Sequence, residues 1–166
     1  MKELLSSITV VVDSREKVNS HLLEYFDKHK IPYKVKALSA FDYTFFLPKN
    51  EKLGIFKDLY FDKDIVFERK ASLEELSGNL TKNRTRFEEE MCTTKALYKY
   101  LIIENANYFD VVNGNYKTEY NSKSFVGTLH SFNSKYDLQI VFMPDKNYTP
   151  IYMYATMQYY LRNILK

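Results

Sequence analysis

The chain has 166 residues, of which 45% are hydrophobic and 27% are charged, so its composition is that of an ordinary globular domain and excludes a disordered chain. A formal net charge of +3 is too small to indicate nucleic-acid binding by itself. The single cysteine, Cys92, excludes an internal disulfide and a cysteine-based zinc site. Because no apolar run reaches membrane-spanning length, we expect a soluble, cytoplasmic protein without membrane contact.

The hydrophobic pattern alternates between strand and helix periods along the chain. Residues 8–12 form an apolar run typical of a strand buried on both faces, and helical spacing follows from residue 18 until Pro32 ends it. Further strands are expected at 33–37, 43–47, 64–70, 100–104 and 138–143, and further helices at 72–78, 84–98, 125–132 and 151–165. The pattern predicts one domain over residues 1–166, a three-layer α/β fold with a central mixed sheet flanked by helices.

Polar side chains stand at the ends of two of these apolar runs. Asp42 precedes the 43–47 strand, and Glu68 and Lys70 end the 64–70 strand. Strand alternation directs Glu68 and Lys70 to one face and Arg69 to the other. Two carboxylates can hold a hard divalent cation, and a nearby ammonium stabilises charge on the attacking or leaving oxygen of a phosphodiester. A Glu-x-Lys triplet alone is a weak signal, because it occurs by chance in most lysine-rich proteins.

Taken in order, Val12–Glu16, Asp42, Glu68–Lys70 and the helix from Arg86 resemble the XPF-type nuclease family. That family belongs to the restriction-endonuclease-like, or PD-(D/E)xK, superfamily. Its core motif is Gly-Asp, then Glu-Arg-Lys, then three residues and an Asp; here Glu-Arg-Lys is intact and Glu74 stands in the last place. The resemblance implies a restriction-endonuclease-like fold and a DNA endonuclease that uses Mg²⁺ or Mn²⁺.

The resemblance also implies roles for individual residues. Asp42 and Glu68 would hold the metal, with Asp13 as a further ligand or water-mediated contact. Lys70 would orient the attacking water or stabilise charge on the phosphate. For Arg69, a catalytic role and a structural ion pair stay equally open. The candidates for contact with substrate phosphates are Arg15, Lys82, Arg84 and Arg86. The alternative for Arg15 is a pair with a nearby carboxylate, and for Arg86 it is an i,i+4 pair with Glu90. The cluster of Lys82, Arg84 and Arg86 has a solvated basic turn as its alternative.

Three features depart from the family pattern. Phe41 replaces the glycine before the metal-binding aspartate, so the turn must differ or tolerate a bulky neighbour. Residues 49–62 look like an inserted excursion. The sequence shows no helix-hairpin-helix module, so we expect substrate choice to come from this domain, a dimer partner or another protein. Relatives pair through the nuclease domain, which makes a homodimer or heterodimer through the C-terminal helices an expectation, although the aromatic 151–165 helix also suits a core.

The expected function is therefore metal-dependent hydrolysis of phosphodiester bonds in branched or junction DNA, during recombination, replication or repair. One alternative is a catalytically silent, DNA-binding or scaffolding subunit of a nuclease heterodimer. Another is a plain duplex nuclease without junction preference. The lysine-, asparagine- and tyrosine-rich composition, with four glycines, is typical of an AT-rich genome, so a small stand-alone member would fit a bacteriophage or mobile element.

Overall fold

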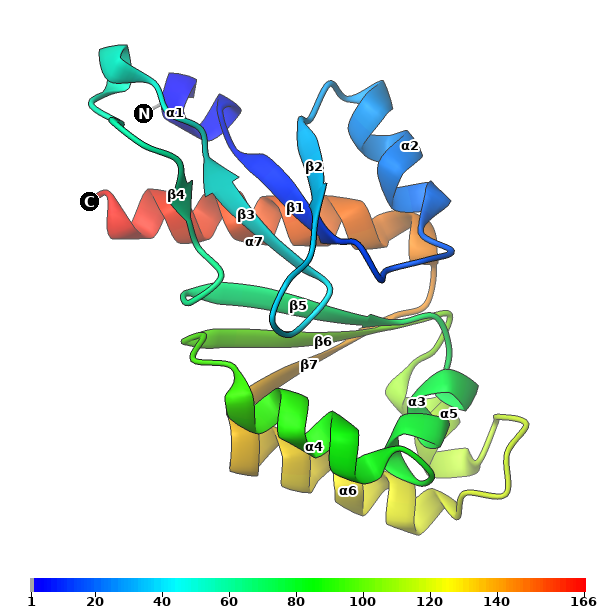
Figure 1. Ribbon diagram of the computed structural model, residues 1–166. Coiled ribbons are helices and arrows are strands. Elements are labelled where there is room, and N and C mark those ends of the chain that lie inside the picture. The colour runs from blue at the N-terminus through cyan, green and yellow to red at the C-terminus, as the bar shows by residue number, and fades with distance from the viewer. Residues whose placement is uncertain (1) are drawn as a thin grey trace.

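The computed structural model describes residues 2–166 and centres on one mixed sheet with helices on both faces (Figure 1), which confirms the predicted three-layer α/β architecture. The strands are β1 (Thr9–Asp13), β2 (Tyr33–Lys36), β3 (Tyr43–Leu47), β4 (Leu59–Tyr60), β5 (Ile65–Lys70), β6 (Tyr98–Glu104) and β7 (Leu138–Met143). The helices are α1 (Lys2–Ser6), α2 (Ser20–Lys28), α3 (Leu73–Leu80), α4 (Arg84–Thr93), α5 (Tyr108–Asn113), α6 (Ser122–Tyr136) and α7 (Thr149–Ile164). Within residues 2–166, no helix is long and apolar enough to cross a membrane.

The sheet has the strand order β2-β1-β3-β5-β6-β7, with β4 pairing with the outer part of β3. Neighbouring strands run parallel in the pairs β1–β2, β5–β6 and β6–β7, whereas β3 runs antiparallel to both β1 and β5. The start of β3 therefore lies beside the carboxyl ends of β1 and β5. This arrangement brings Asp42, immediately before β3, next to the ends of the strands that carry Asp13 and Glu68.

Alternation along each strand divides the core into two halves. On β5, Ile65 and Phe67 face the core under α1, α2 and α7, whereas Val66 faces the core under α3 to α6. Helix α7 contributes Met153 and Met157 to the first core, so its apolar stripe serves as core on that side. Each helix covers the sheet because burying its apolar stripe removes hydrocarbon surface from water.

Several local predictions needed revision. The expected excursion at 49–62 returns to the sheet as β4, where Tyr60 stacks on Phe46 with ring centroids 4.9 Å apart. Helix α4 ends at Thr93, and Tyr98 opens β6 instead of continuing the helix. The pattern did not predict the short helices α1 and α5, because helices of five and six residues offer too few turns for a clear period.

Candidate active site

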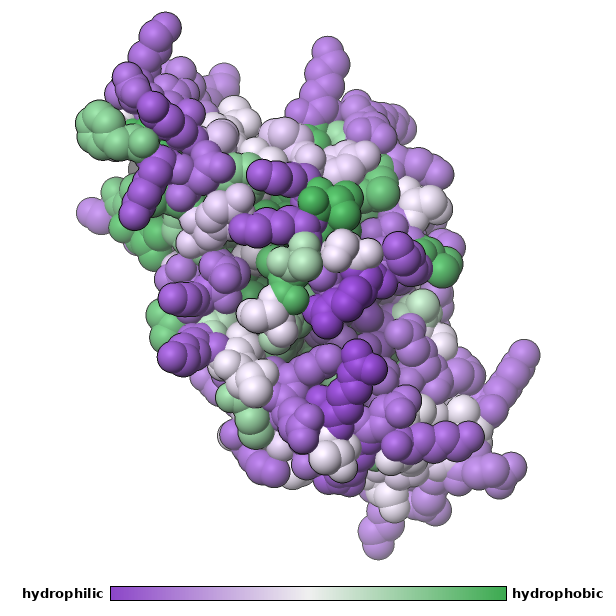
Figure 2. All heavy atoms as spheres, in the orientation of Figure 1, coloured by the Kyte–Doolittle hydropathy of each residue, from purple (hydrophilic) through white to green (hydrophobic). Residues whose placement is uncertain are grey.

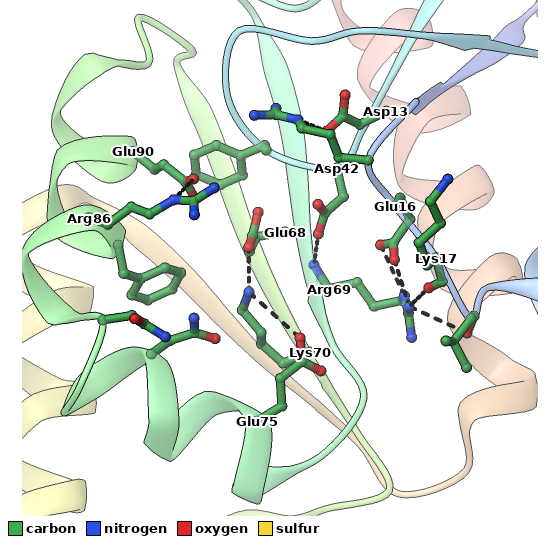
Figure 3. Close-up of a pocket in the computed structure, with 16 residues that line it drawn as sticks. Asp13, Glu16, Lys17, Asp42, Glu68, Arg69, Lys70, Glu75, Arg86 and Glu90 are labelled. Carbon is green, nitrogen blue, oxygen red and sulfur yellow. Dashed lines mark hydrogen bonds and ion pairs between the residues drawn. The ribbon is translucent and has the colours of Figure 1, made fainter.

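A cleft of about 520 Å³ lies where β1 and β5 end and β3 begins, facing α3 and α4 (Figure 3). It is lined by seven of the nine side chains that the sequence singled out, namely Asp13, Arg15, Asp42, Glu68, Arg69, Lys70 and Arg86. Lys82 and Arg84 do not line it. The cleft is thus bordered by residues that lie far apart in the sequence and that the sheet order brings together.

The Glu68–Lys70 pair lies on one face of β5, as strand alternation predicts. The Lys70 Nζ donates a 2.6 Å hydrogen bond to Glu68 Oε1, and both side chains are buried. Lys70 Nζ is also 4.0 Å from Glu75 Oε1 on α3 and 5.2 Å from the centroid of the Phe87 ring. The ammonium is therefore held at the wall of the cleft by two carboxylates and an aromatic face.

Asp42 is anchored by backbone hydrogen bonds on both of its neighbouring strands. Its N–H donates to the Phe67 carbonyl at 2.9 Å, and its own carbonyl accepts from the Asp13 N–H at 2.7 Å. Its Oδ2 accepts the Arg69 N–H at 2.8 Å, an interaction visible in Figure 3. These bonds fix Asp42 at the cleft, beside the strand that carries Glu68.

The pKa values of both carboxylates are raised, chiefly by burial. Burial, together with repulsion from Glu68 and Glu16, raises the pKa of Asp42 well above its ordinary value. Burial also raises the pKa of Glu68, although the charge of Lys70 opposes this. Burial by itself would lower the pKa of Lys70, but attraction from Glu68 outweighs it and the pKa is raised, so the ammonium stays charged. One ammonium thus faces two desolvated carboxylates, an arrangement that favours an additional positive charge.

Asp13 uses both of its carboxylate oxygens within the protein. Oδ1 accepts the Leu38 N–H at 3.0 Å, and Oδ2 accepts from Arg15 Nε at 2.7 Å. Over residues 2–166, no three His, Cys, Asp or Glu side chains are arranged as a ready-made metal cage. Asp42 and Glu68 form a two-carboxylate set, which is the kind that Mg²⁺ shares with water and substrate phosphate. A direct or water-mediated contact from Asp13 stays a prediction.

The Arg69 guanidinium faces away from Lys70, into a buried set of acids. It donates to Glu16 Oε1 at 2.8 Å and to Glu104 Oε2 at 2.9 Å, and it reaches the Lys17 carbonyl at 3.1 Å. Glu104 Oε1 lies 2.8 Å from His21 Nε2 on α2. Of the two roles that the sequence left open for Arg69, these contacts favour the structural ion pair, in which Glu104 bonds both Arg69 and His21.

The basic candidates near α4 separate into two groups. Arg86 lines the cleft with a 76% exposed side chain, and its Nε lies 3.7 Å from Glu90 Oε1. Arg84 pairs with Glu88 at 3.1 Å and lies over the Phe132 ring, away from the cleft. Side chains two residues apart on a helix point in different directions. Arg86 can therefore reach a substrate in the cleft although Arg84 cannot.

The cleft also contains residues that the sequence motifs did not predict. Glu74, which stands in the last place of the family motif, accepts the Lys117 N–H and does not line the cleft; Glu75 lies beside Lys70 instead. Asn79 on α3 and Asn83, which immediately precedes α4, also line the cleft, and Asn79 Oδ1 is buried without a hydrogen-bond partner among the described residues. No pattern in the sequence marks these two amides, because their positions depend on how α3 and α4 pack against the sheet.

The turn before Asp42 accommodates Phe41 in the place where the family has glycine. Phe41 has a φ of 64°, the left-handed conformation that glycine adopts without strain, and its ring is 2% exposed. The ring belongs to the core under α3 and α4, which includes Leu76 and Phe87. The turn is thus tolerated because burial of the ring offsets a backbone strain of about 1–2 kcal/mol. Through its ring, Phe41 connects the backbone next to Asp42 with the helices α3 and α4 on the other wall of the cleft.

Substitutions at Phe41 should show an unusual order of stability, with phenylalanine above glycine and glycine above alanine. Phe41→Gly should lower the free energy of unfolding by about 2–4 kcal/mol, because the lost ring leaves a cavity. Relief of the backbone strain offsets part of this cost. Phe41→Ala loses the ring and keeps the strain, so it should be less stable by about a further 1 kcal/mol. Urea denaturation measures both; an alanine variant more stable than the glycine variant would contradict the strained turn.

The fold and the cleft together define an XPF-type nuclease domain of the restriction-endonuclease-like superfamily. A family model described as the ERCC4 domain matches residues 12–156, and the chain belongs to this family. Solved structures that share the fold include two of one archaeal protein. XPF from Aeropyrum pernix has a TM-score of 0.66 and 16% identity, with 92% of this chain and 61% of that chain covered. The same archaeal protein in complex with DNA has a TM-score of 0.66 and 15% identity, with 93% and 65% covered.

The archaeal chains are longer than the part that this chain matches. The chain spans less than two thirds of the length of either archaeal chain, 61% of one and 65% of the other. No curated protein matches it.

Proposed function

We propose that this domain is a divalent-metal-dependent DNA endonuclease that acts on branched or junction DNA. The observation that carries the proposal is the meeting of Asp42, Glu68 and Lys70 in one cleft, with Glu68 buried, Asp42 partly buried and the ammonium bonded to Glu68. Two desolvated carboxylates beside one ammonium suit a hard cation with oxygen ligands. Membership of the ERCC4 domain family supports the same assignment.

In the proposed mechanism, Asp42 and Glu68 would hold Mg²⁺ or Mn²⁺, and the bound ion would supply positive charge beside the scissile phosphate. Lys70, fixed by Glu68, orients the attacking water or stabilises charge that develops on the phosphate. Asp42 keeps its position through the Arg69 N–H. Arg15 and Arg86, both exposed at the cleft, bind neighbouring phosphates of the substrate. In-line attack on phosphorus leaves 5′-phosphate and 3′-hydroxyl ends.

Cleavage should require both the metal and the Lys70 ammonium. The purified protein should nick DNA with Mg²⁺ or Mn²⁺ and lose this activity in excess EDTA. Lys70→Met, which keeps the buried stem, should lower the rate of cleavage about 10²–10³-fold, since it removes a charge aimed at the reacting phosphate. Cleavage at the wild-type rate in Lys70→Met, with circular dichroism showing an intact fold, would contradict the assignment.

Comparing forks, flaps, four-way junctions and linear duplex tests the substrate class. Preferential cutting of branched substrates supports the proposal, and equal cutting of linear duplex would indicate a plain duplex nuclease. DNA binding without cleavage under any metal would indicate a catalytically silent subunit. The expected pairing through the C-terminal helices and the cytoplasmic location stay predictions; sedimentation velocity measures the first.

A further inference from the structure

Helices cover only one half of the sheet on the side where the cleft opens. In residues 2–166, α3 to α6 pack over β5, β6 and β7, and no helix lies over β1 to β4 on this side (Figure 1). The opposite side of these strands is covered, because Val10 and Val12 face the core under α7. Figure 2 shows that the open half carries hydrophilic side chains interspersed with apolar ones.

Two lysines of β2 lie across this open half. Register places Lys34 beside Val11 and Lys36 beside Asp13, on the side away from α7. Lys34 Nζ is 5.8 Å from the centroid of the Phe46 ring, and Lys36 Nζ is 3.9 Å from that of the Tyr60 ring. We call Lys34, Lys36, Phe46 and Tyr60 the lysine face. Because the rings restrain the two ammonium groups, less side-chain entropy is lost when an anion binds them.

The charge of the lysine face is not compensated by its surroundings. Among the described residues, neither Lys34 nor Lys36 forms an ion pair. The acidic side chain that β1, β2 and β3 place on this side is that of Asp13. It is buried and already accepts hydrogen bonds from Arg15 and from the Leu38 N–H. The face therefore presents positive charge to solvent.

The lysine face is continuous with the cleft through Arg15. The side chain of Arg15 is 57% exposed and lines the cleft. Its guanidinium also donates to the Leu38 carbonyl at 3.0 Å, in the loop that follows β2. Cationic groups thus extend from the reacting centre onto the open half of the sheet. A polyanion that enters the cleft meets matching charge along this path.

We propose that the lysine face binds the sugar-phosphate backbone of the DNA arm that leaves the cleft past Arg15. The inference rests on the proposed nuclease function and assigns it a second substrate contact. Ammonium groups neutralise phosphates without reading bases, so the face adds affinity and orientation but no sequence preference. The chemistry fixed by Asp42 and Lys70 does not involve it.

The test is the double variant Lys34→Gln/Lys36→Gln, which removes both charges and keeps most of each stem over the rings. Fluorescence anisotropy of labelled duplex DNA in EDTA should show a salt slope reduced by about 2, since each phosphate contact contributes about 0.9, and about 3–10-fold weaker binding at physiological salt. Cleavage should show a raised KM and an unchanged kcat. Lys34→Arg/Lys36→Arg should restore wild-type binding, because guanidinium groups keep the charge.

A matched control is Lys28→Gln/Lys123→Gln, which removes two exposed lysines from α2 and α6 and should change neither the slope nor KM. If the lysine-face variant binds and cleaves DNA like this control, the inference is wrong while the nuclease function stands. If the wild-type protein neither binds nor cuts DNA, the proposed function fails and the inference fails with it. Melting temperatures of both double variants check that binding is not lost through unfolding.

Discussion

Replacing Asp42 with asparagine should abolish DNA cleavage and, at the same time, stabilise the metal-free protein. Asparagine can still accept the Arg69 N–H, so the local structure is kept. It removes a carboxylate whose pKa is raised by burial and by repulsion from Glu68 and Glu16. We expect a rise in Tm of a few degrees, because about 1 kcal/mol corresponds to about 2–4 °C in a domain of this size. Activity should fall at least about 10³-fold, since a metal ligand is lost.

The pH dependence of stability follows from the same repulsion. A carboxyl whose pKa is raised in the folded state holds its proton more tightly there than in the unfolded chain. Its contribution to stability is complete below the ordinary aspartate pKa, about 4, and is lost as pH rises through the raised value of the folded state. Without metal, the wild-type protein should therefore lose stability with rising pH over this window, and Asp42→Asn should lose less. Differential scanning calorimetry at several pH values in EDTA measures the difference.

Glu51→Gln is a suitable control for these measurements, since Glu51 is an exposed carboxylate paired only with Lys49. It should leave Tm and cleavage unchanged. If Asp42→Asn is less stable than the wild type in EDTA, the electrostatic account of the site is wrong. If it cleaves DNA normally, the metal assignment is wrong whatever its stability.

Replacing Arg69 with methionine should destabilise the protein by about 3–5 kcal/mol. The substitution keeps much of the side-chain volume but leaves Glu16 and Glu104 buried without their shared cation. The cost arises from these two uncompensated charges and not from a lost surface ion pair. Chemical denaturation followed by circular dichroism measures it.

A second substitution separates this explanation from simple loss of packing. Adding Glu104→Gln to Arg69→Met should recover part of the stability, because one of the stranded charges is removed. Arg84→Met, which breaks an exposed pair with Glu88, should cost no more than about 0.5 kcal/mol. Equal costs for Arg69→Met and Arg84→Met would show that the buried acids do not govern the stability of this region.

Much of the active site could be predicted from local patterns. The period of two along a strand separated Glu68 and Lys70 from Arg69, and the structure confirms that separation. The ordered motifs indicated the family, to which the chain belongs. The same reasoning could not place Glu74 or Arg84, because a position in a motif does not determine which way a helix is turned against the sheet.

Local sequence thus determined most of the longer strands and helices, and which side chains of a strand share a face, because these depend on backbone geometry that repeats every two or 3.6 residues. The tertiary structure decided which faces meet. The antiparallel insertion of β3 between β1 and β5 brought Asp42 to Glu68, and the segment after β1 and the end of β6 provided partners for Arg69. No helix of residues 2–166 covers one side of β1 to β4, and Lys34 and Lys36 of the edge strand β2 are exposed there. Strand order and helix packing arise from contacts between distant segments, which no local period contains.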